Sequence, residues 1–380
     1  MITLGRLRYT AILIILILLL GLIVPNIMPV NCQLKKIGID VSPRRVKGLE
    51  ENSCKELLNY LVNSLTEEGY TVKLLEEITP KNLEGLDALV LGLVGDVYSN
   101  EGAYTEEEIE AISNWFKEGG KFIWIAVSSN YTDSSLCPKD LTFKIEESNK
   151  ILQAINSHLR FDKAIVEDPD NNAGEAYIII VDKSSGGIND EGKASKITED
   201  IDKILFYSSI GIAGYKDNEF VNVENIIDNE NIFWLCRTGP HARVITNAQA
   251  PPNVYTATYE GRLYVAVAEE VPVISDLFTI VYSKVLVTGN PIIGDKSLVI
   301  SEYNGIKLEG LQFVLNVFKW GTEIRAEPNT TGYIIIGAIV IIVVVAMTAY
   351  TLRKGKRKST SIEYSGQETG GEDIIYLVAI

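Results

Sequence analysis

The stretch GGKFIWIAVSSNYT, residues 119–132, decides how this chain folds because it joins a helix end to a buried strand. Paired glycines such as those at its start are typical of a helix C-terminus. The apolar run that begins at Phe122 has no polar face, which is typical of a central strand in a parallel sheet. Ser128 and Ser129 follow at the carboxyl end of that strand, where many α/β enzymes carry a nucleophile.

Helices and strands alternate on both sides of this stretch. Residues 104–120 predict a helix, with Thr105 as N-cap and acidic residues in the first turn. Residues 86–94 are apolar on both faces and predict a second central strand. The other expected elements are strands at 35–42, 70–76 and 162–168 and helices at 48–69 and 147–159. This order predicts an α/β fold with a Rossmann- or flavodoxin-like parallel sheet and helices on both faces.

The pattern becomes β-rich at about residues 176–275, with short apolar pieces separated by Gly, Pro and Asn. One of these pieces, YEGRLYVAVAEE, predicts a hairpin that turns at Glu260 and Gly261. A buried strand at 283–291 and a helix at 308–321 then restore the α/β pattern. We therefore expect one α/β domain over residues 31–331, interrupted by a β-rich insertion.

The N-terminal segment does not belong to a soluble core. Residues 9–24 are apolar and follow Arg6 and Arg8, which is typical of a secretory signal peptide or an uncleaved N-terminal anchor within residues 1–30. No A-x-A cleavage pattern follows, so the sequence leaves open whether this segment is removed.

A second apolar segment, residues 332–352, has 21 residues without a charge. A helix of that length spans about 30 Å, the thickness of the hydrocarbon core of a bilayer. The basic stretch RKGKRK at 353–358 follows at once and predicts a cytoplasmic tail over residues 353–380. We thus expect a single-pass or two-pass protein of the cell membrane, with residues 31–331 outside.

The charge of the chain argues against a nucleic-acid partner. The formal net charge is −15, and because both ends are basic, the outer part is more acidic still. Such a surface repels nucleic acid and anionic lipid headgroups. The sequence also lacks G-x-G-x-x-G after its first strand, so we expect no dinucleotide and no other cofactor.

Cysteines and glycosylation triplets fit an extracytoplasmic domain. No C-x-x-C motif occurs, and four cysteines outside the membrane permit disulfides in three alternative pairings. Two N-x-S/T triplets are acceptors for N-linked glycans by pattern. The disulfide candidates are Cys32, Cys54, Cys137 and Cys236, and the glycosylation candidates are Asn130 and Asn329.

Several stretches carry a resemblance to a known group. The segments LEGLDALVLG (83–92) and YTEEEIEAISNWFKEGGKFIWIA (104–126), together with VLVTGNP (285–291), are similar to the glutamine-amidotransferase-like domain of certain membrane proteins. Those proteins are described as ABC-transport-associated or gliding-motility-auxiliary proteins. The resemblance covers roughly residues 36–325, and it implies an amidotransferase-like fold and ABC transporter subunits as partners.

The catalytic residues of an amidotransferase do not match at the expected position. That chemistry needs a cysteine on a strained turn with flanking glycines, and a histidine as base. The sequence has AVSSNY at this position. A serine hydrolase would instead use Ser128 or Ser129, with either His158, expected inside the helix at 147–159, or His241 as base.

Two further groups are candidate binding residues. Asp168, Asp170 and Asn172 stand at alternate positions, a spacing that suits oxygen ligands of Ca²⁺, although an Asx-rich turn explains the same residues. Arg44 and Arg45 follow the first strand and could meet an anion, or form part of a solvated loop.

The sequence therefore predicts a membrane-anchored extracytoplasmic binding or accessory module without catalysis, associated with an ABC-type transport system. It does not identify the small-molecule ligand. The alternatives are an extracytoplasmic serine hydrolase and a structural cell-envelope protein.

Overall fold

The computed structural model describes residues 34–129, 138–245, 251–256, 258–274, 276–294 and 297–360. Its central sheet has the order β10-β12-β13-β4-β3-β1-β2, and an eighth strand, β16, pairs with β13. The strands are β10 (Ile232–Arg237), β12 (Tyr264–Ile274), β13 (Thr279–Thr288), β4 (Phe122–Val127), β3 (Ala88–Leu93), β1 (Lys36–Asp40), β2 (Thr71–Leu75) and β16 (Arg325–Pro328). The five strands from β2 to β13 are parallel, as the sequence predicts. In contrast, β12 and β16 run antiparallel to β13, and β10 pairs antiparallel with β12.

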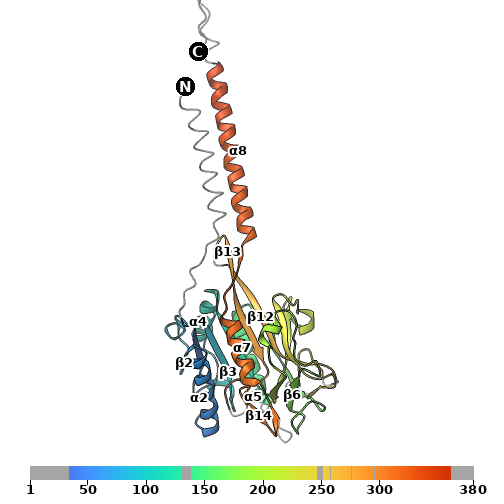
Figure 1. The fold of residues 1–380 in the computed structure, drawn as a ribbon. Helices are drawn as coiled ribbons and strands as arrows, with labels where there is room; N and C mark the ends of the chain where they lie inside the picture. The colour runs from blue at the N-terminus through green and yellow to red at the C-terminus, as the bar shows by residue number, and fades with distance from the viewer. Residues whose placement is uncertain are drawn as a thin grey trace, which may run out of the picture. The chain divides into compact units, whose positions relative to one another are not determined.

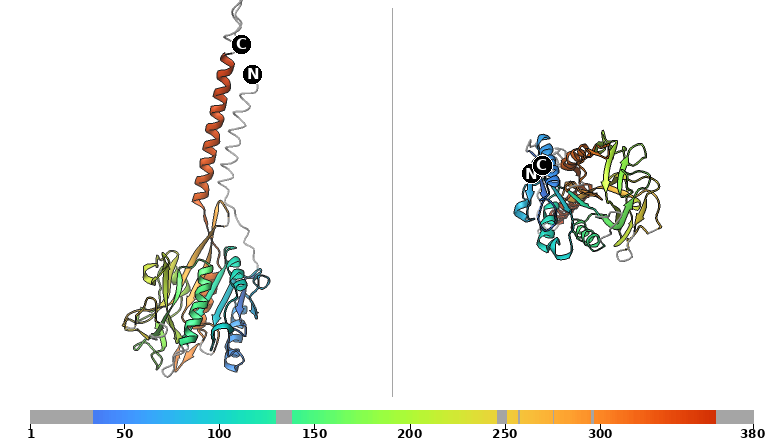
Figure 2. Two further views of the ribbon diagram at one scale, coloured as in Figure 1. Left: turned by 180° about the vertical axis from the view of Figure 1, so that it is seen from behind. Right: turned by 90° about the horizontal axis from the view of Figure 1, so that it is seen from below.

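Helices cover both faces of this sheet. Figure 1 shows α2 and α7 on the near face, and the view from behind in Figure 2 shows α5 on the other. Two separate apolar cores result, because alternate strand residues point to opposite faces: Trp124 packs with α2 and α7, and Ile123 packs with α4 and α5. The helices are α2 (Asn52–Glu67), α3 (Pro80–Leu83), α4 (Glu106–Phe116), α5 (Pro138–Ala154), α6 (Ala194–Ile197) and α7 (Gly310–Thr322), with 3₁₀ turns at Ser99–Glu101 and Val223–Asn225.

Local chemistry explains where these elements begin and how closely they pack. The Thr105 hydroxyl accepts from the Glu108 N–H (3.2 Å) and the Glu108 carboxylate accepts from the Thr105 N–H (3.0 Å), so α4 begins with the expected N-cap as part of a full capping box. On the other face, a Cβ on Gly321 would lie 2.4 Å from the Phe122 ring. The glycine therefore allows α7 to approach the sheet closely.

A second sheet departs from the sequence prediction. It has the order β11-β5-β8-β9 and contains β5, so the strand expected at 162–168 does not extend the parallel sheet. Conversely, β10 and β12 come from the β-rich region but belong to the central sheet. The strands outside the central sheet are β11 (Arg243–Ile245), β5 (Leu159–Glu167), β8 (Ile210–Lys216), β9 (Glu219–Asn222), and the pairs β6 (Ile178–Asp182) with β7 (Lys203–Tyr207) and β14 (Glu302–Tyr303) with β15 (Ile306–Lys307).

The predicted hairpin at Glu260 and Gly261 is wrong. Glu260 makes only an isolated bridge to Arg243, and no strand precedes it within residues 251–256 and 258–259. The hairpin that forms is β12–β13, whose register runs from Ala266 opposite Thr288 to Ile274 opposite Ile280. The strand YVAVAEE therefore forms its hairpin with the segment that follows it, and its other neighbour in the sheet is β10.

The last helix, α8 (Thr330–Thr360), contains a candidate membrane span at Thr330–Tyr350, close to the predicted 332–352. It is the one such helix among the described residues, and few of its side chains are buried. The expected N-terminal segment at residues 1–30 and the end of the tail, residues 361–380, lie outside the part of the chain that the structure describes.

Candidate functional site

A cavity of about 460 Å³ lies at the carboxyl ends of the parallel strands. The strand order β2-β1-β3-β4-β13 is the flavodoxin-like order. In this order the connection after β1 leads to β2 on one side, and the connection after β3 leads to β4 on the other. The crevice at this topological switch point is where open α/β sheets bind ligands. We call this space the switch-point cavity. Its residues come from the β1–α2 connection, from the segments that follow β3, β4 and β13, and from α2 and β7, which contribute Cys54 and Tyr207.

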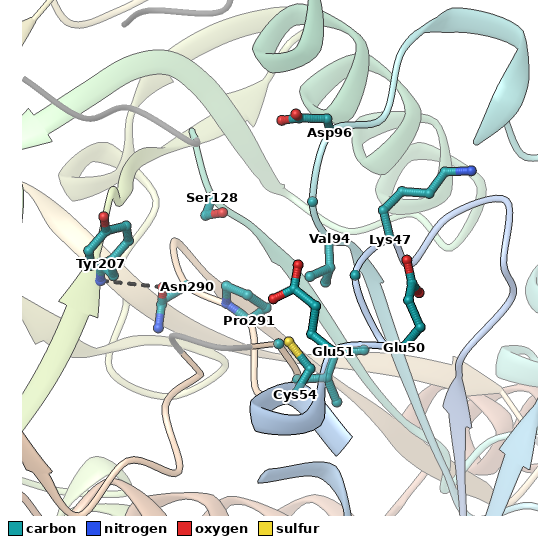
Figure 3. Close-up of a pocket in the computed structure, with 14 residues that line it drawn as sticks. Lys47, Glu50, Glu51, Cys54, Val94, Asp96, Ser128, Tyr207, Asn290 and Pro291 are labelled. Carbon is teal, nitrogen blue, oxygen red and sulfur yellow. Dashed lines mark hydrogen bonds between the residues drawn. The ribbon is translucent and has the colours of Figure 1, made fainter. Parts of the chain in front are cut away.

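The walls of the switch-point cavity are largely polar, and most of their charged side chains are acidic. Figure 3 shows Glu51, Cys54 and Ser128 around one space, with Asn290 on the side of β13. Glu51 is the N-cap residue of α2, where a negative charge is favoured by the helix dipole. The Tyr207 N–H donates to the Asn290 side-chain oxygen at 3.3 Å, which holds the amide at the cavity wall.

The formal charges around the cavity favour a cation over an anion. Glu50, Glu51 and Asp96 line it, and Lys47 is the one cationic side chain among its lining residues. The Lys47 ammonium lies 3.4 Å from the Glu101 carboxylate, which offsets its charge. A cleft lined by one sign of charge raises the local concentration of the opposite sign.

Arg45 is engaged inside the protein and not in the cavity. Its guanidinium is fully buried, donates to Asp40 at 2.6 Å and to Glu108 at 3.0 Å, and lies over the Tyr104 ring at 4.8 Å. Burial alone would lower the pKa of this guanidinium, but Tyr104 and the two carboxylates outweigh it and raise the pKa. Arg44, which is half exposed, also donates to Glu108, at 2.9 Å. The two arginines, for which the sequence left an anion contact or a solvated loop open, thus pair with carboxylates, Arg45 inside the protein and Arg44 at its surface.

The two serines have different environments. Ser129 is fully buried, and both its N–H and its hydroxyl donate to the Ser208 carbonyl oxygen at 2.8 Å. Ser128 lines the switch-point cavity. Of the predicted nucleophiles, Ser128 is therefore the one that a ligand in the cavity could reach.

Neither histidine lines that cavity. His158 lies after α5 and not inside a helix, because α5 ends at Ala154. Its Nδ1 is 2.7 Å from Glu269 Oε1. In the sheet, Glu269 of β12 lies opposite Val285 of β13, and Val285 lies opposite Ile123 of β4. Ser128 is five residues further along β4, or about 16 Å at the rise of a strand. The structure therefore separates His158 from Ser128.

His241 lies near Glu260, at 3.6 Å, and both side chains are exposed. His241 is in the connection between β10 and β11, and Glu260 is in the connection between β11 and β12. The sequence left open a catalytic triad with one of these histidines as base. Among the described residues this triad does not form around Ser128, because both histidines contact carboxylates elsewhere.

The Asp168 loop is an Asx-rich turn. Asp168 Oδ1 accepts from the backbone N–H groups of Asp170 (3.1 Å) and Asn171 (2.9 Å), and its Oδ2 accepts from Gly239 N–H (2.8 Å). The Asn172 amide donates to the Asp168 carbonyl oxygen at 3.0 Å. Within the described ranges no three His, Cys, Asp or Glu side chains are grouped to hold a metal ion.

Of the disulfide candidates, Cys54 and Cys236 are buried and do not bond to each other. Burial raises the pKa of the Cys236 thiol well above its usual value, so this thiol is inert. Cys32, Cys137 and the glycosylation candidate Asn130 lie outside the described residues. The pairing that joins Cys54 to Cys236 is therefore excluded.

Asn329, the second glycosylation candidate, caps α8. Its side-chain oxygen accepts from the Gly332 N–H at 3.2 Å, and its side-chain nitrogen donates to the Asp276 carbonyl oxygen at 3.5 Å. The residue is 8% exposed. A glycan on that nitrogen would require this cap to open.

Sequence reasoning missed most of the cavity. It singled out Ser128, and it named Cys54 only as a disulfide candidate. The signal that could have found the others, except Tyr207 on β7, is the position of each residue after a predicted parallel strand, since those ends meet at one edge of the sheet. The missed residues whose side chains define the walls are Lys47, Glu50, Glu51, Asp96, Tyr207 and Asn290.

Two solved structures are similar to this chain at low TM-scores. One is a ThuA-like protein from Bacteroides uniformis, with 10% identity, a TM-score of 0.38, and coverage of 76% of this chain and 90% of the other. The second is the glutaminase domain of a CTP synthase from Trypanosoma brucei with bound acivicin, with 10% identity, a TM-score of 0.32, and coverage of 77% and 98%. No protein-family model matches the sequence, and no curated protein matches it.

Proposed function

We propose that this protein is a membrane-anchored extracytoplasmic binding module, whose ligand site is the switch-point cavity and which does not catalyse a reaction. The observation that supports this proposal is the cavity itself, at the edge of the parallel sheet where ligands of this topology bind. A cavity of about 460 Å³ is within the range of sites that hold small molecules.

Binding rather than hydrolysis is supported by the positions of the histidines. A seryl nucleophile needs a base within hydrogen-bond reach. His158 lies against Glu269 in the middle of β12, well away from the cavity, and His241 lies against Glu260. Ser128 in the cavity favours the hydrolase as the second candidate, with a carboxylate in place of a histidine as base.

The ligand class that fits best is a small molecule with one or more ammonium groups. The carboxylates of Glu50, Glu51 and Asp96 offer acceptors for such groups, and Asn290 and Ser128 can take part in neutral hydrogen bonds. An anionic ligand would be repelled by these carboxylates, and among the lining residues Lys47 alone has a positive charge to attract it.

The membrane anchor in this proposal is α8. Its apolar part, Thr330–Tyr350, is long enough for a bilayer, and side chains from other elements cover few of its residues. The basic stretch 353–358 supports a cytoplasmic end by the positive-inside rule. The acidic α/β domain then lies outside the cell membrane, where an amine ligand would reach the cavity.

Association with an ABC-type transport system is the further part of the proposal, and it is supported by the sequence resemblance alone. Its test is purification of the full chain from its native membranes in mild detergent, with mass spectrometry of the proteins that accompany it. A stoichiometric ATPase or permease subunit is the expected result. Recovery of the chain alone, or of a ladder of its own oligomers, would contradict the association and favour a structural envelope protein.

The binding proposal is tested by comparing a cationic ligand with an anionic one. The full chain in lipid nanodiscs is titrated by calorimetry with spermidine, and separately with malonate. Saturable binding of spermidine to one site, with no binding of malonate, is expected. Binding of malonate, or of neither compound, would contradict a cation site in the switch-point cavity.

A further inference from the structure

An exposed apolar tip stands at the end of the β12–β13 hairpin. Ile274 is 73% exposed, Leu277 56% and Phe278 37%, and we call these three side chains the hairpin tip. Three neighbouring apolar side chains at the end of a strand pair are costly to leave in water, so such a group marks a contact surface.

The hairpin tip is fastened to the first turn of α8. The Asn329 N–H donates to the Phe278 carbonyl oxygen at 2.6 Å, and the rings of Phe278 and Tyr333 are 5.4 Å apart. A Cβ on Gly332 would lie 1.5 Å from the Leu277 carbonyl oxygen, so only glycine permits this approach. The tip and the start of the apolar helix therefore lie side by side.

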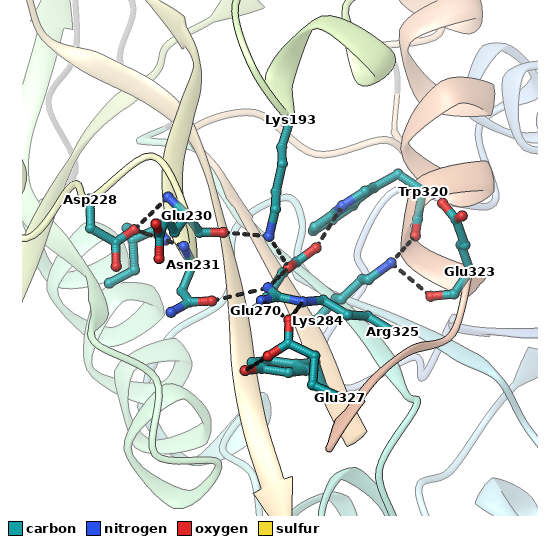
Figure 4. A network of polar contacts seen from close by, with 12 residues as sticks. Lys193, Asp228, Glu230, Asn231, Glu270, Lys284, Trp320, Glu323, Arg325 and Glu327 are labelled. Atoms are coloured by element: carbon teal, nitrogen blue, oxygen red, sulfur yellow. Dashed lines mark hydrogen bonds and ion pairs between the residues drawn. The ribbon is translucent and has the colours of Figure 1, made fainter. Parts of the chain in front are cut away.

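The strands below the tip are held by a buried ion network, shown in Figure 4. Glu270 on β12 pairs with Lys193 (2.6 Å) and with Arg325 on β16, and it accepts from the Trp320 indole of α7 at 3.2 Å. Burial would raise the pKa of Glu270, but the hydrogen bonds from Lys193 and Arg325 outweigh it and lower the pKa. This network joins β12, β16 and α7, and β16 leads into α8 after a single residue, Asn329.

We propose that the hairpin tip is a membrane-contact element that sits in the interfacial layer of the lipid bilayer, beside the first turn of α8. The inference rests on the proposed anchoring by α8. The contacts with Asn329 and Gly332 place the tip at the depth where the apolar helix begins. Phe278 and Tyr333 form an aromatic pair at that depth, where aromatic rings are favoured.

The polar groups around the tip agree with an interfacial position. The Asp276 carboxylate accepts hydrogen bonds from the N–H groups of Phe278 and Thr279, both at 2.7 Å. Backbone donors of the same turn therefore bind this negative charge. Arg325 and Glu327 form an ion pair on β16, where they lie opposite Tyr282 and Ile280 of β13. The charged residues thus flank the tip. Tyr333 packs against Phe278, and in this arrangement lipid would cover the apolar surface of the tip that the described residues leave exposed.

This contact would also orient the ligand site. The tip is at the start of β13, and the switch-point cavity includes Asn290 just after the end of β13. The ten residues of that strand extend about 33 Å. The cavity would then open at the end of the domain far from the membrane, toward ligands in the bulk phase.

The test uses a fluorescent NBD group on cysteines introduced into the full chain, which is held in nanodiscs with and without nitroxide-labelled lipids. The positions are L277C in the tip, I339C in α8, and L74C on β2 as an exposed apolar control. The unsubstituted chain serves as the blank for native cysteines. We expect quenching by nitroxides near the headgroups at Leu277 to be several-fold stronger than at Leu74, and quenching by deeper nitroxides at Ile339.

Each outcome has a separate meaning. Quenching at Ile339 without quenching at Leu277 would overturn the tip contact and leave the anchor intact. No quenching at Ile339 would overturn the anchor itself. A third variant places L277C beside I274S and F278S. If its label is quenched as strongly as in the apolar tip, the label inserts by itself and the contact is overturned. Weaker quenching in that variant would support the proposal.

Discussion

The His158 imidazole lies 2.7 Å from the Glu269 carboxylate, which is in the middle of β12 and well away from the switch-point cavity. Glu269 also accepts from the His158 backbone N–H at 3.1 and 3.0 Å and from the Ser157 hydroxyl. Glu269 is buried, whereas the His158 side chain is more than half exposed. The pair joins the segment after α5 to β12, and its role is structural.

We expect this pair to make stability depend on pH. The hydrogen bond to Glu269 raises the pKa of His158 above 6.5, even though burial opposes it. A raised folded-state pKa contributes stability that is fully present below the unfolded pKa and is lost as the pH rises through the folded pKa. The difference in unfolding free energy between the wild type and H158Q should therefore decrease as the pH rises above 6.5.

The measurement is urea unfolding followed by circular dichroism at a series of pH values. The matched control is H241Q, because the exposed pair of His241 with Glu260 should contribute little. A stability difference for H158Q that grows with rising pH would show that the interaction has the opposite sign.

The buried guanidinium of Arg45 should be far more important to stability than that of its neighbour Arg44. R45M would leave Asp40 and Glu108 as buried carboxylates without their main partner, which costs about 3–5 kcal/mol. R44M removes a half-exposed partner of Glu108 and should cost about 0.5 kcal/mol. Denaturant unfolding of the two variants checks this order. Equal losses would mean that Arg45 is not an internal ion-pair partner.

Ser128 should not react as a nucleophile. We expect no adduct at Ser128 after treatment of the full chain with a fluorophosphonate probe, as checked by peptide mass spectrometry. A known serine hydrolase added to the same sample controls for the activity of the probe. Stoichiometric labelling that disappears in S128A would contradict a binding role and favour the hydrolase.

The parallel part of the fold could be predicted because its signals are local. Thr105 is followed three residues later by Glu108, which forms the capping box, and apolar runs at 86–94 and from Phe122 have the composition of central strands. The antiparallel additions could not be predicted in the same way. Pairing of β10 with β12 depends on contacts between segments about 30 residues apart, for which the sequence has no local signal.

The candidate site shows the same limit. Arg45 and Glu108 are 63 residues apart, so the sequence alone suggested a solvated loop or an anion site at Arg45. The helix expected to hold His158 ends earlier because Asn156 has a φ of 57°, a left-handed conformation that asparagine tolerates. The acidic residues of the cavity are in connections that follow different strands. These connections come together only once the order of the strands in the sheet is known.

The most direct test of the ligand site compares the effects of removing two carboxylates, Glu51 at the start of α2 and Glu56 within it. Glu51 lines the switch-point cavity, and Glu56 lies on the exposed surface of the same helix. Each is changed to glutamine in the full chain in nanodiscs, and spermidine affinity is measured by calorimetry. We expect E51Q to weaken binding about tenfold, as the loss of a charged hydrogen-bond acceptor implies, and E56Q to leave it unchanged. Equal affinities for E51Q and the wild type, or equal losses in both variants, would contradict a ligand site in this cavity.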